Sequence, residues 1–264
     1  MSNASSSGRF VGRRVLVTGG SGGIGAEVCR RFAREGARVA VHYGRREAAA
    51  EEVRQALEAE PSHAGGHVAL GADLADAAAA RALVEEAIDA LGGIDVLVNN
   101  AGVFELHAPL DSDFETWTRA WRRALDINLA GAAHAAWAAA RHMSAHGGGR
   151  IVNVSSRGAF RGEPESPAYG ASKAGLNALS QSLAAALAPH DIFVYAVAPG
   201  FVETAMARPH LAGDRAQAVR NQSPLGRVAT VGDVAYWVLA MAAEGAEFAT
   251  GTILDVNGAS YLRT

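Results

Sequence analysis

Tyr169 and Lys173 are spaced so that together they could transfer a proton. Residues four apart lie on one face of a helix, so a helix beginning near Ala168 would bring their polar ends together. A phenol with a pKa of about 10 is a poor acid or base at neutral pH, but a neighbouring ammonium stabilises the phenolate. The pair predicts a tyrosine whose pKa the lysine lowers, although taken alone it is more typical of a solvated helix face.

A hydroxyl group precedes this pair at a position that favours ligand contact. The β-branched run Ile151-Val-Asn-Val154 predicts a buried strand, and Ser155 and Ser156 follow it directly. Ligands of open α/β sheets bind outside the carboxyl ends of the strands. We therefore expect Ser156, thirteen residues before Tyr169, to lie beside a bound ligand.

The spacing of Ser156, Tyr169 and Lys173 resembles the active-site signature of the short-chain dehydrogenase/reductase family, in the branch of 3-oxoacyl-[acyl-carrier-protein] reductases and glucose 1-dehydrogenases. The resemblance extends from about residue 10 to about residue 260. It implies an α/β Rossmann fold in one domain over residues 10–264. In that fold a doubly wound parallel sheet of seven strands, in the order 3-2-1-4-5-6-7, carries helices on both faces.

A glycine-rich stretch follows the first predicted strand, Arg14–Thr18, and leads into a helix from about Ile24 to Glu35. Glycines let the backbone turn tightly and approach a pyrophosphate, whose charge then meets free amides at the helix N-terminus. Between a strand and a helix, this stretch predicts dinucleotide binding. By the resemblance, its contacts with the cofactor come from Gly19, Ser21, Gly23, Ile24 and Gly25.

The end of the second predicted strand, Arg38–Tyr43, bears on the choice of cofactor. Relatives that prefer NAD usually carry an acid where this chain has Tyr43, and Arg45 and Arg46 follow. Because guanidinium groups bind phosphate in a bidentate fashion, NADP(H) is favoured over NAD(H). Against this, the glycine loop has no basic residue, and the two arginines could merely open a solvated helix that ends near Glu58.

Four further motifs match the family in order, and their roles are those that the resemblance implies. A third strand, Val68–Leu70, precedes Asp73 and Leu74, which would contact adenine, although Asp73 could instead cap a helix over Ala77–Leu91. A fourth strand, Ile94–Val98, precedes Asn99 and the cofactor-binding Asn100, Ala101 and Gly102. Asn128, inside a helical stretch, would hold a water linked to Lys173. After a strand over Ile192–Val197, Pro199, Gly200, Val202 and Thr204 would bind the nicotinamide end.

Residues 201–226 are polar, contain two prolines and show weak periodicity, so we interpret them as a mobile substrate lid. Arg157 and Arg161 could attract a carboxylate or an acyl carrier, or could be surface charges of a loop. Phe104, Phe160 and Phe201 could instead line a pocket for an apolar or cyclic ketone. A helix over about Val231–Ala243 and a strand over Thr252–Val256 are expected to close the fold.

By resemblance, the reaction is hydride transfer between a nicotinamide and a carbonyl or secondary alcohol substrate. Tyr169 would donate the proton, Ser156 would bind the substrate oxygen, Lys173 would bind the nicotinamide ribose and Asn128 would complete a proton relay. Two alternatives stay open. One is an epimerase or dehydratase of the same fold without net redox change, and the other is a nucleotide sensor without catalysis.

Composition limits the other classes of partner. The formal net charge is −3 without a basic block, which argues against nucleic acid, and no stretch of about 18 apolar residues predicts a membrane span. The single cysteine, Cys29, fits a reducing compartment, so we expect a cytoplasmic protein. We also expect a disordered tail over residues 1–9 and no metal site, and the resemblance implies a homotetramer or homodimer.

Overall fold

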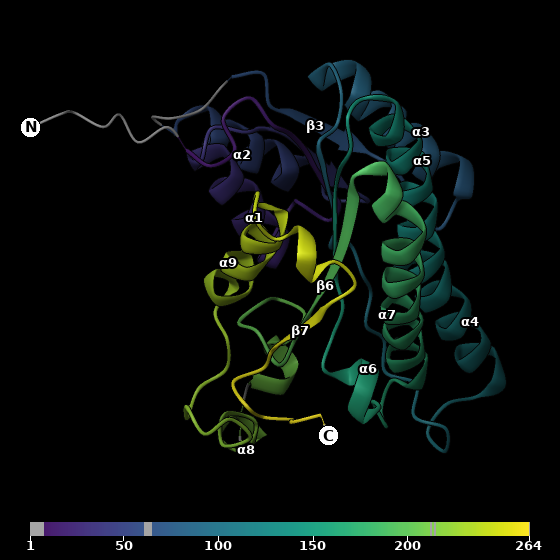
Figure 1. Cartoon of the computed structure of the whole chain (residues 1–264). Helices are drawn as coiled ribbons and strands as arrows, with labels where there is room; N and C mark the ends of the chain where they lie inside the picture. Colours follow the sequence, from purple (N-terminus) through teal and green to yellow (C-terminus); the bar gives the residue numbers. More distant parts are fainter. Residues whose placement is uncertain (1–7, 61–64, 212, 214, 264) are drawn as a thin grey trace, which may run out of the picture.

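Seven parallel strands form the central layer of the computed structural model, which describes residues 8–60, 65–211, 213 and 215–263 (Figure 1). Their order across the sheet is β3-β2-β1-β4-β5-β6-β7, which confirms the predicted topology. The strands are β1 (Arg14–Val17), β2 (Arg38–Tyr43), β3 (Val68–Gly71), β4 (Val96–Asn99), β5 (Gly149–Val154), β6 (Ile192–Pro199) and β7 (Ile253–Val256).

The strand order reverses at β1, and this reversal determines where a ligand can bind. Val15 of β1 pairs with Val39 of β2 on one side and with Val96 of β4 on the other. The connections after β1 and β4 therefore leave the sheet in opposite directions, which opens a crevice at the carboxyl ends of these strands. All of β4 and most of β5 and β6 are buried on both faces, which accounts for their continuous apolar sequences.

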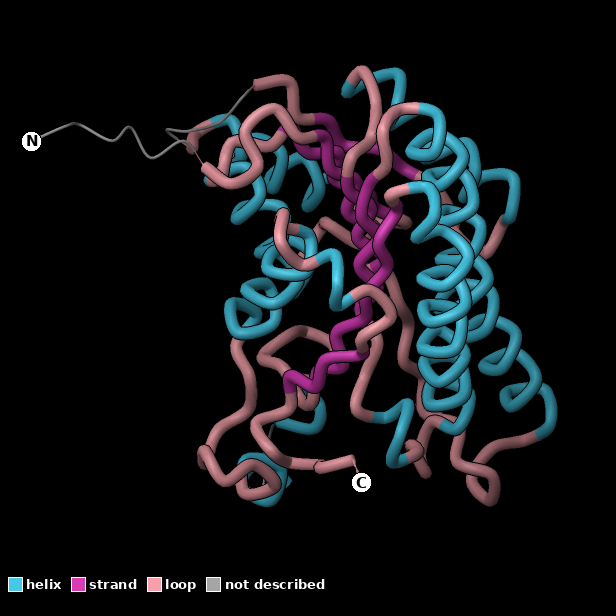
Figure 2. Tube along the Cα trace, viewed as in Figure 1, coloured by secondary structure: helices cyan, strands magenta, loops and turns pink. Residues whose placement is uncertain are grey.

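Two layers of helices cover the two faces of the sheet, as Figure 2 shows. One face packs against α1 (Gly23–Arg34), α2 (Glu47–Glu58) and α9 (Val231–Ala242). The other packs against α3 (Ala77–Leu91), α5 (Ala132–Ala145) and α7 (Pro167–Leu187), with α4 (Phe114–Leu125) lying against α7. Each layer buries its own core, with Phe32 among the large side chains of the first and Ile151 among those of the second.

The helical stretch between α4 and α5 is not regular. It contains a π-helical segment, η1 (Asp126–Gly131), where the sequence predicted an ordinary helix. A π turn holds one more residue than an α turn and is frequent at functional sites. Asn128 lies in the middle of this segment with its side chain buried.

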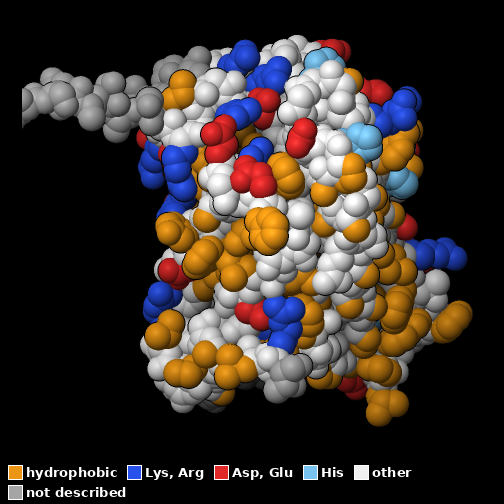
Figure 3. Space-filling model, viewed as in Figure 1, with side chains coloured by type: hydrophobic (Ala, Val, Ile, Leu, Met, Phe, Trp, Pro, Cys, Tyr) orange, Lys and Arg blue, Asp and Glu red, His pale blue; other side chains and the backbone are white. Residues whose placement is uncertain are grey.

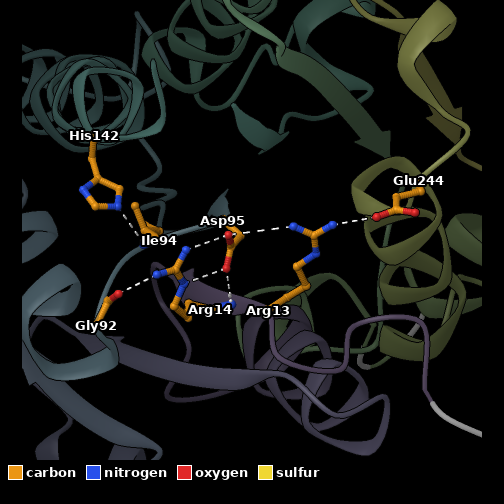
Figure 4. Close-up of polar contacts among 7 residues, drawn as sticks. All are labelled: Arg13, Arg14, Gly92, Ile94, Asp95, His142 and Glu244. Atoms are coloured by element: carbon orange, nitrogen blue, oxygen red, sulfur yellow. Dashed lines mark hydrogen bonds and ion pairs between the residues drawn. The ribbon is translucent and has the colours of Figure 1, made fainter. Parts of the chain in front are cut away.

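The amino-terminal edge of the sheet is held by an ion-pair network (Figure 4). Asp95, just before β4, accepts hydrogen bonds from the backbone N–H of Arg14 at 2.7 Å and from its Nε at 2.8 Å. Arg13 joins the network by pairing with Asp95 at 3.9 Å, and it also pairs with Glu244 at 2.6 Å. His142 of α5 accepts from the backbone N–H just before Asp95. These contacts fix β1 against β4 at the edge opposite the crevice.

Several shorter elements complete the chain. They are α6 (Gly158–Arg161), α8 (Arg215–Arg220), and the 3-10 helices η2 (Ala188–His190), η3 (Arg208–Leu211) and η4 (Glu247–Ala249). Both η3 and α8 lie in the segment interpreted as a lid, where the sequence predicted no helix. Within the predicted tail, residues 1–7 lie outside the described residues, whereas Arg9 pairs with Glu35 at 2.6 Å. None of the described helices is long and apolar enough to cross a membrane.

Candidate active site

A cavity of about 950 Å³ opens at the carboxyl ends of the strands, between the glycine loop and the start of α7. It brings together most of the residues singled out in the sequence. These are Gly19, Ser21, Gly23, Ile24, Arg45, Arg46, Asp73, Leu74, Asn100, Ala101, Gly102, Ser156, Tyr169, Lys173, Pro199, Gly200, Val202 and Thr204. Three predicted site residues do not line it, namely Gly25, Tyr43 and Asn128.

The glycine loop is shaped by close backbone approaches. Gly19 and Gly23 have positive φ angles of 66° and 55°, which other residues rarely adopt. A side chain on Gly25 would come within 2.3 Å of the Gly19 oxygen, so Gly25 serves the packing of loop against helix instead of facing the cavity. No side chain caps the N-terminus of α1 at Gly22. The free amides of α1 are therefore available to an anion, as a pyrophosphate requires.

Arg46 supplies the basic group that the glycine loop itself lacks. A Cβ on Gly22 would lie 3.1 Å from both terminal guanidinium nitrogens of Arg46, so this guanidinium covers the loop. Arg46 is the N-cap residue of α2, which begins at Glu47, so Arg45 and Arg46 precede the helix instead of lying within it. Tyr43 turns away from the cavity and packs against Gly71 at the end of β3.

His42 holds the glycine loop from the end of β2, a role that its sequence position did not suggest. It is 2% exposed and lines the cavity. Its Nδ1 accepts from the Gly19 N–H at 3.0 Å, which leaves Nε2 to donate to the Ala72 oxygen at 3.1 Å. Both bonds require a neutral ring, and burial lowers the pKa of His42 accordingly.

Asp73 and Leu74 line the cavity just beyond the end of β3. Asp73 does not cap α3, because the N-cap residue is Asp76, whose carboxylate accepts from the N–H groups of Ala78 and Ala79. The Asp73 carboxylate accepts from the nearby Ala75 N–H, at 3.1 Å. Of the two roles considered for Asp73, the cap of α3 is wrong, and adenine contact stays a prediction.

Asn100 ties the glycine loop to the end of β4. Its backbone N–H donates to Thr18 Oγ1 at 3.0 Å, and its side-chain amide donates to the Thr18 oxygen at 2.9 Å. On the opposite side of the cavity, Thr204 lies within ordinary contact distance of a Cβ placed on Gly23. Val202 is buried and bridges to Ala229. The segment after β6 thereby closes over the loop that follows β1.

Ser156, Tyr169 and Lys173 converge at the other end of the cavity. Ser156 follows β5 and forms a side-chain hydrogen bond with Tyr169, which comes from the first turn of α7. Lys173 is 3% exposed, and its ammonium lies 5.9 Å from the centre of the Tyr169 ring. Phe104 packs edge-on against the same ring with centroids 5.1 Å apart. The predicted meeting of two hydroxyls and an ammonium is thus observed.

The pKa of Tyr169 differs from the sequence-based expectation that Lys173 lowers it. Burial raises the pKa of Tyr169, while the hydrogen bond with Ser156 acts in the opposite direction. Burial lowers the pKa of Lys173 to about 8. Its ammonium donates to the Val154 backbone oxygen at 2.8 Å. The Tyr169 pKa is therefore not lowered overall, because desolvation of the phenol outweighs the groups that favour the phenolate.

Asn128 lies just behind the cavity wall, where it binds two other elements. Its side-chain oxygen accepts from the Val103 N–H at 2.8 Å. Its amide donates to the Val103 oxygen and to Ser172 Oγ, each at 3.0 Å. A Cβ on Gly102 would lie 3.3 Å from the Asn128 oxygen and 3.5 Å from Lys173 Nζ. Asn128 therefore positions the strand end and α7 around the lysine.

His107 supports the start of α7, a role that the sequence did not predict. It is 2% exposed, and its Nε2 accepts from the Ala168 N–H at 3.1 Å. Its Nδ1 donates to the Glu105 oxygen at 2.8 Å, and Ser166 Oγ donates to that same oxygen. These bonds satisfy amide groups at the helix start and so fix the turn that carries Tyr169.

The two arginines after Ser156 have different environments. Arg161 is exposed and pairs with Glu163 at 3.5 Å, as expected for a surface charge. Arg157 is only 3% exposed, and its Nη1 donates to Ser260 Oγ at 2.6 Å. Its guanidinium lies 5.3 Å from the centre of the Phe201 ring. For Arg157, the interpretation as a surface charge is wrong.

The residues fit a nicotinamide dinucleotide from one end of the cavity to the other. A glycine loop with open helix amides lies at the switch point of the sheet, and a tyrosine, a serine and a lysine meet beyond it. A fold and site of this kind define a dinucleotide-dependent dehydrogenase. Among the described residues, no group of three His, Cys, Asp or Glu side chains gathers to hold a metal ion.

Comparisons with known proteins identify the family. The short chain dehydrogenase family matches residues 13–214. The chain is 40% identical to cis-4-hydroxycyclohexanecarboxylate dehydrogenase of Sinomonas cyclohexanicum, over 94% of this chain and 96% of that protein. It is 34% identical to the 3-oxoacyl-[acyl-carrier-protein] reductase FabG of Staphylococcus aureus, over 95% and 98%. A short chain dehydrogenase from Burkholderia cenocepacia, crystallised with NADP, superimposes with a TM-score of 0.85 at 35% identity, over 96% and 99%.

The chain belongs to the short-chain dehydrogenase/reductase family. It is an NAD(P)-dependent oxidoreductase that acts on alcohol and carbonyl groups. The family and the reaction class predicted from the sequence are confirmed.

Proposed function

We propose that Ser156, Tyr169 and Lys173 carry out the reaction, that Asn128 positions Lys173, and that NADP(H) is the preferred cofactor. The observation that supports this most is the convergence of the Ser156 and Tyr169 hydroxyls beside the buried Lys173 ammonium, within one cavity that also contains the glycine loop. The bound nicotinamide supplies or accepts the hydride. Side chains of the protein hold the substrate oxygen and transfer its proton.

In the direction of reduction, Tyr169 donates its phenolic proton to the substrate oxygen as negative charge develops there. Ser156 donates a hydrogen bond to the same oxygen and keeps it close to the phenol. The positive charge of Lys173, 5.9 Å from the Tyr169 ring, stabilises the phenolate that remains. Asn128 keeps Lys173 in place by fixing Val103 and Ser172. In oxidation, the same groups act in reverse.

The preference for NADP(H) is supported by the position of Arg46. Its guanidinium covers Gly22 at the point where the ribose next to adenine is expected, and no ion pair between Arg46 and a described residue neutralises it. The end of β2 carries Tyr43 and not an acid, so no negative charge there would repel a phosphate. A guanidinium in this place favours the additional phosphate of NADP.

A direct test uses the purified enzyme with a panel of ketones, aldehydes and secondary alcohols, followed by nicotinamide absorbance with each cofactor. We expect turnover with carbonyl or alcohol substrates and a higher kcat/KM with NADP(H). Cofactor binding without turnover of any carbonyl would refute the oxidoreductase proposal in favour of a nucleotide sensor. Conversion without net change of the cofactor would point to an epimerase or dehydratase.

We also propose that the enzyme forms a homo-oligomer. Figure 3 shows hydrophobic side chains spread over the face that carries α9 and the edge strand β7. Tyr236 and Trp237 of α9 are 54% and 39% exposed, and Phe248 is fully exposed nearby in sequence. Aromatic side chains in such positions favour association with another chain. Light scattering behind a sizing column would test this, and a monomer at micromolar concentration would refute it.

A reducing compartment, the cytoplasm, is the proposed location. Cys29, the one cysteine of the chain, is a free and fully buried thiol in α1. Its burial raises its pKa far above the ordinary value, so it is unreactive and serves packing. Detection of the enzyme in a periplasmic or secreted fraction would contradict this location.

A further inference from the structure

Arg157 is a buried cation whose side chain is not held by an ion pair, and it follows Ser156 directly in the chain. No carboxylate of the described residues forms an ion pair with it, and its partners are the Ser260 hydroxyl and the Phe201 ring. Its neighbour Glu163 forms its ion pair with Arg161 and acts on Arg157 only as a nearby opposite charge. A buried charge is costly unless it is paired, so an unpaired guanidinium in an active site suggests a ligand of opposite charge.

Arg157 borders cavity space on two sides. Arg157 and Phe201 line the active-site cavity and also a second cavity of about 560 Å³, so the two side chains form part of the wall between them. Some described polar atoms are sealed in the protein without a partner, but none of these belongs to Arg157. The N–H groups of Arg157 that do not bond to Ser260 are therefore not completely sealed, although the residue is only 3% exposed.

Arg157 lies at the substrate end of the cavity, away from the expected phosphate positions. Its backbone N–H donates to the Pro199 oxygen at 2.8 Å, which places it where β5 and β6 end. The glycine loop and Arg46 lie at the opposite end, near the ends of β1 and β2. An anion at Arg157 therefore belongs to the substrate and is separate from the phosphates of the cofactor.

The surroundings of Arg157 favour a carboxylate over a phosphate. A planar guanidinium matches either a carboxylate or a phosphate with two parallel hydrogen bonds, but its single positive charge balances a carboxylate, whereas a phosphate carries about two negative charges. Here the neighbouring groups are a neutral hydroxyl and an aromatic ring, and the nearby Arg161 is already paired with Glu163. Phe201 holds the guanidinium plane in position and offers an apolar surface to the rest of the substrate.

We propose that the substrate is an oxo or hydroxy carboxylic acid whose carboxylate binds Arg157 while its reacting oxygen lies between Ser156 and Tyr169. This inference rests on the proposed function, because it uses the same end of the cavity. The aromatic rings of Phe104 and Phe201 enclose the carbon skeleton that joins the two oxygen-bearing groups. The carboxylate thereby sets which face of the substrate carbon meets the nicotinamide.

Binding of matched acids and amides to the enzyme saturated with NADP⁺ tests this proposal without relying on turnover. Titration calorimetry would compare cyclohexanecarboxylate with cyclohexanecarboxamide, and hexanoate with hexanamide. Of the two acids, we expect the one that binds the wild type more tightly to bind at least about tenfold more tightly than its own amide, as a charge-assisted hydrogen bond predicts. Equal binding of acid and amide in both pairs, or no binding of either acid, would overturn the proposal.

Variants of Arg157 test whether this residue causes the preference for acid over amide. Arg157→Gln should lose the preference for acid over amide, and Arg157→Lys should keep part of it because the charge remains without the planar geometry. Arg81→Gln, an equal loss of charge on the exposed surface of α3, should bind like the wild type. Circular dichroism and NADP⁺ binding would verify that each variant is folded. An Arg157→Gln enzyme with the full wild-type preference would refute the assignment.

Turnover separates failure of this inference from failure of the proposed function. With 4-oxocyclohexanecarboxylate and its carboxamide, we expect Arg157→Gln to raise KM for the acid by about tenfold or more and to leave KM for the amide nearly unchanged. Turnover of neutral ketones without any acid preference would refute only the role of Arg157. Acid binding that depends on Arg157, without turnover of any carbonyl, would refute the oxidoreductase mechanism and leave the carboxylate site standing.

Discussion

Lys173 Nζ donates a hydrogen bond to the backbone oxygen of Val154 at 2.8 Å. Val154 is the last residue of β5, and Ser156 follows it two positions later, so this bond joins the helix that carries Tyr169 to the strand that delivers the serine. The lysine thus has a structural contact as well as a charge. Removal of its ammonium would disturb both, which makes the tyrosine a cleaner position for testing the chemistry.

Replacement of Tyr169 by phenylalanine removes the proton donor and keeps the ring that packs against Phe104. We expect kcat to fall by about 10²- to 10⁴-fold, the usual contribution of a general acid or base. The dissociation constant for NADP⁺ should change little. Steady-state kinetics and fluorescence titration of the cofactor measure the two quantities, and turnover at the wild-type rate would exclude Tyr169 as the acid.

Replacement of Arg46 by glutamine tests the basis of cofactor choice. The guanidinium over Gly22 is expected to bind the additional phosphate, so its loss should weaken NADP⁺ binding by about tenfold or more. NAD⁺ binding should be nearly unaffected. Arg54→Gln is a matched control on α2, since the guanidinium of Arg54 is hydrogen-bonded to Glu51. Equal weakening for both cofactors would show that Arg46 does not discriminate between them.

Replacement of Asn128 by alanine should lower the free energy of unfolding by about 1–3 kcal/mol, because the N–H and C=O of Val103 lose their partners inside the protein. Urea denaturation measures this change. Ser172→Ala removes only one of the bonds to Asn128 and should cost less. If Asn128→Ala were as stable as the wild type, the side chain could not be what fixes Val103.

The neutral ring of His42 predicts a dependence on pH. Burial holds the pKa of His42 in the folded protein below its ordinary value of 6.5. Between these two pKa values the unfolded chain binds more protons than the folded chain, so stability from His42 is complete above about pH 6.5 and decreases as the pH falls towards the folded pKa. Protonation of Nδ1 would also place a ring N–H against the Gly19 N–H, so the hydrogen bond between them would be lost.

Unfolding of the wild type and His42→Gln in urea at about pH 5.5 and about pH 7.5 isolates this effect from the other histidines. We expect the wild type to lose more stability than the variant on acidification, because a glutamine can accept and donate without titrating. NADP⁺ affinity should follow the same trend, since Gly19 belongs to the glycine loop. An identical loss in both proteins would exclude His42 as the titrating group.

Much of this fold was predictable because its signals are local. Buried parallel strands are continuous apolar runs, and the predicted end of the α3 helix at Leu91 agrees with the structure. The chemistry of Ser156, Tyr169 and Lys173 was also accessible, because a strand end and a helical spacing determine where their side chains meet. Glycines that require positive φ angles marked the loop for the same reason.

Other features depend on contacts between distant residues, which a single sequence does not reveal. His107 meets Ala168 across sixty-one positions, and His42 meets Ala72 across thirty. The sequence shows Arg157 and Arg161 as similar loop residues, and only folding buries the first behind Ser260. The π-helical segment around Asn128 likewise has no distinct periodicity, because it adds a single residue to an otherwise helical pattern.

The hydrogen bond between Arg157 and Ser260 makes the closing residues of the chain part of the wall around the substrate. A purification tag, fusion partner or surface tether joined behind Thr264 would therefore begin only five positions after Ser260. Arg9, in contrast, is paired with Glu35 at the C-terminal end of α1, far along that helix from the glycine loop. Attachment ahead of Arg9 leaves the entrance for small molecules unobstructed, so immobilised forms of the enzyme are best anchored there.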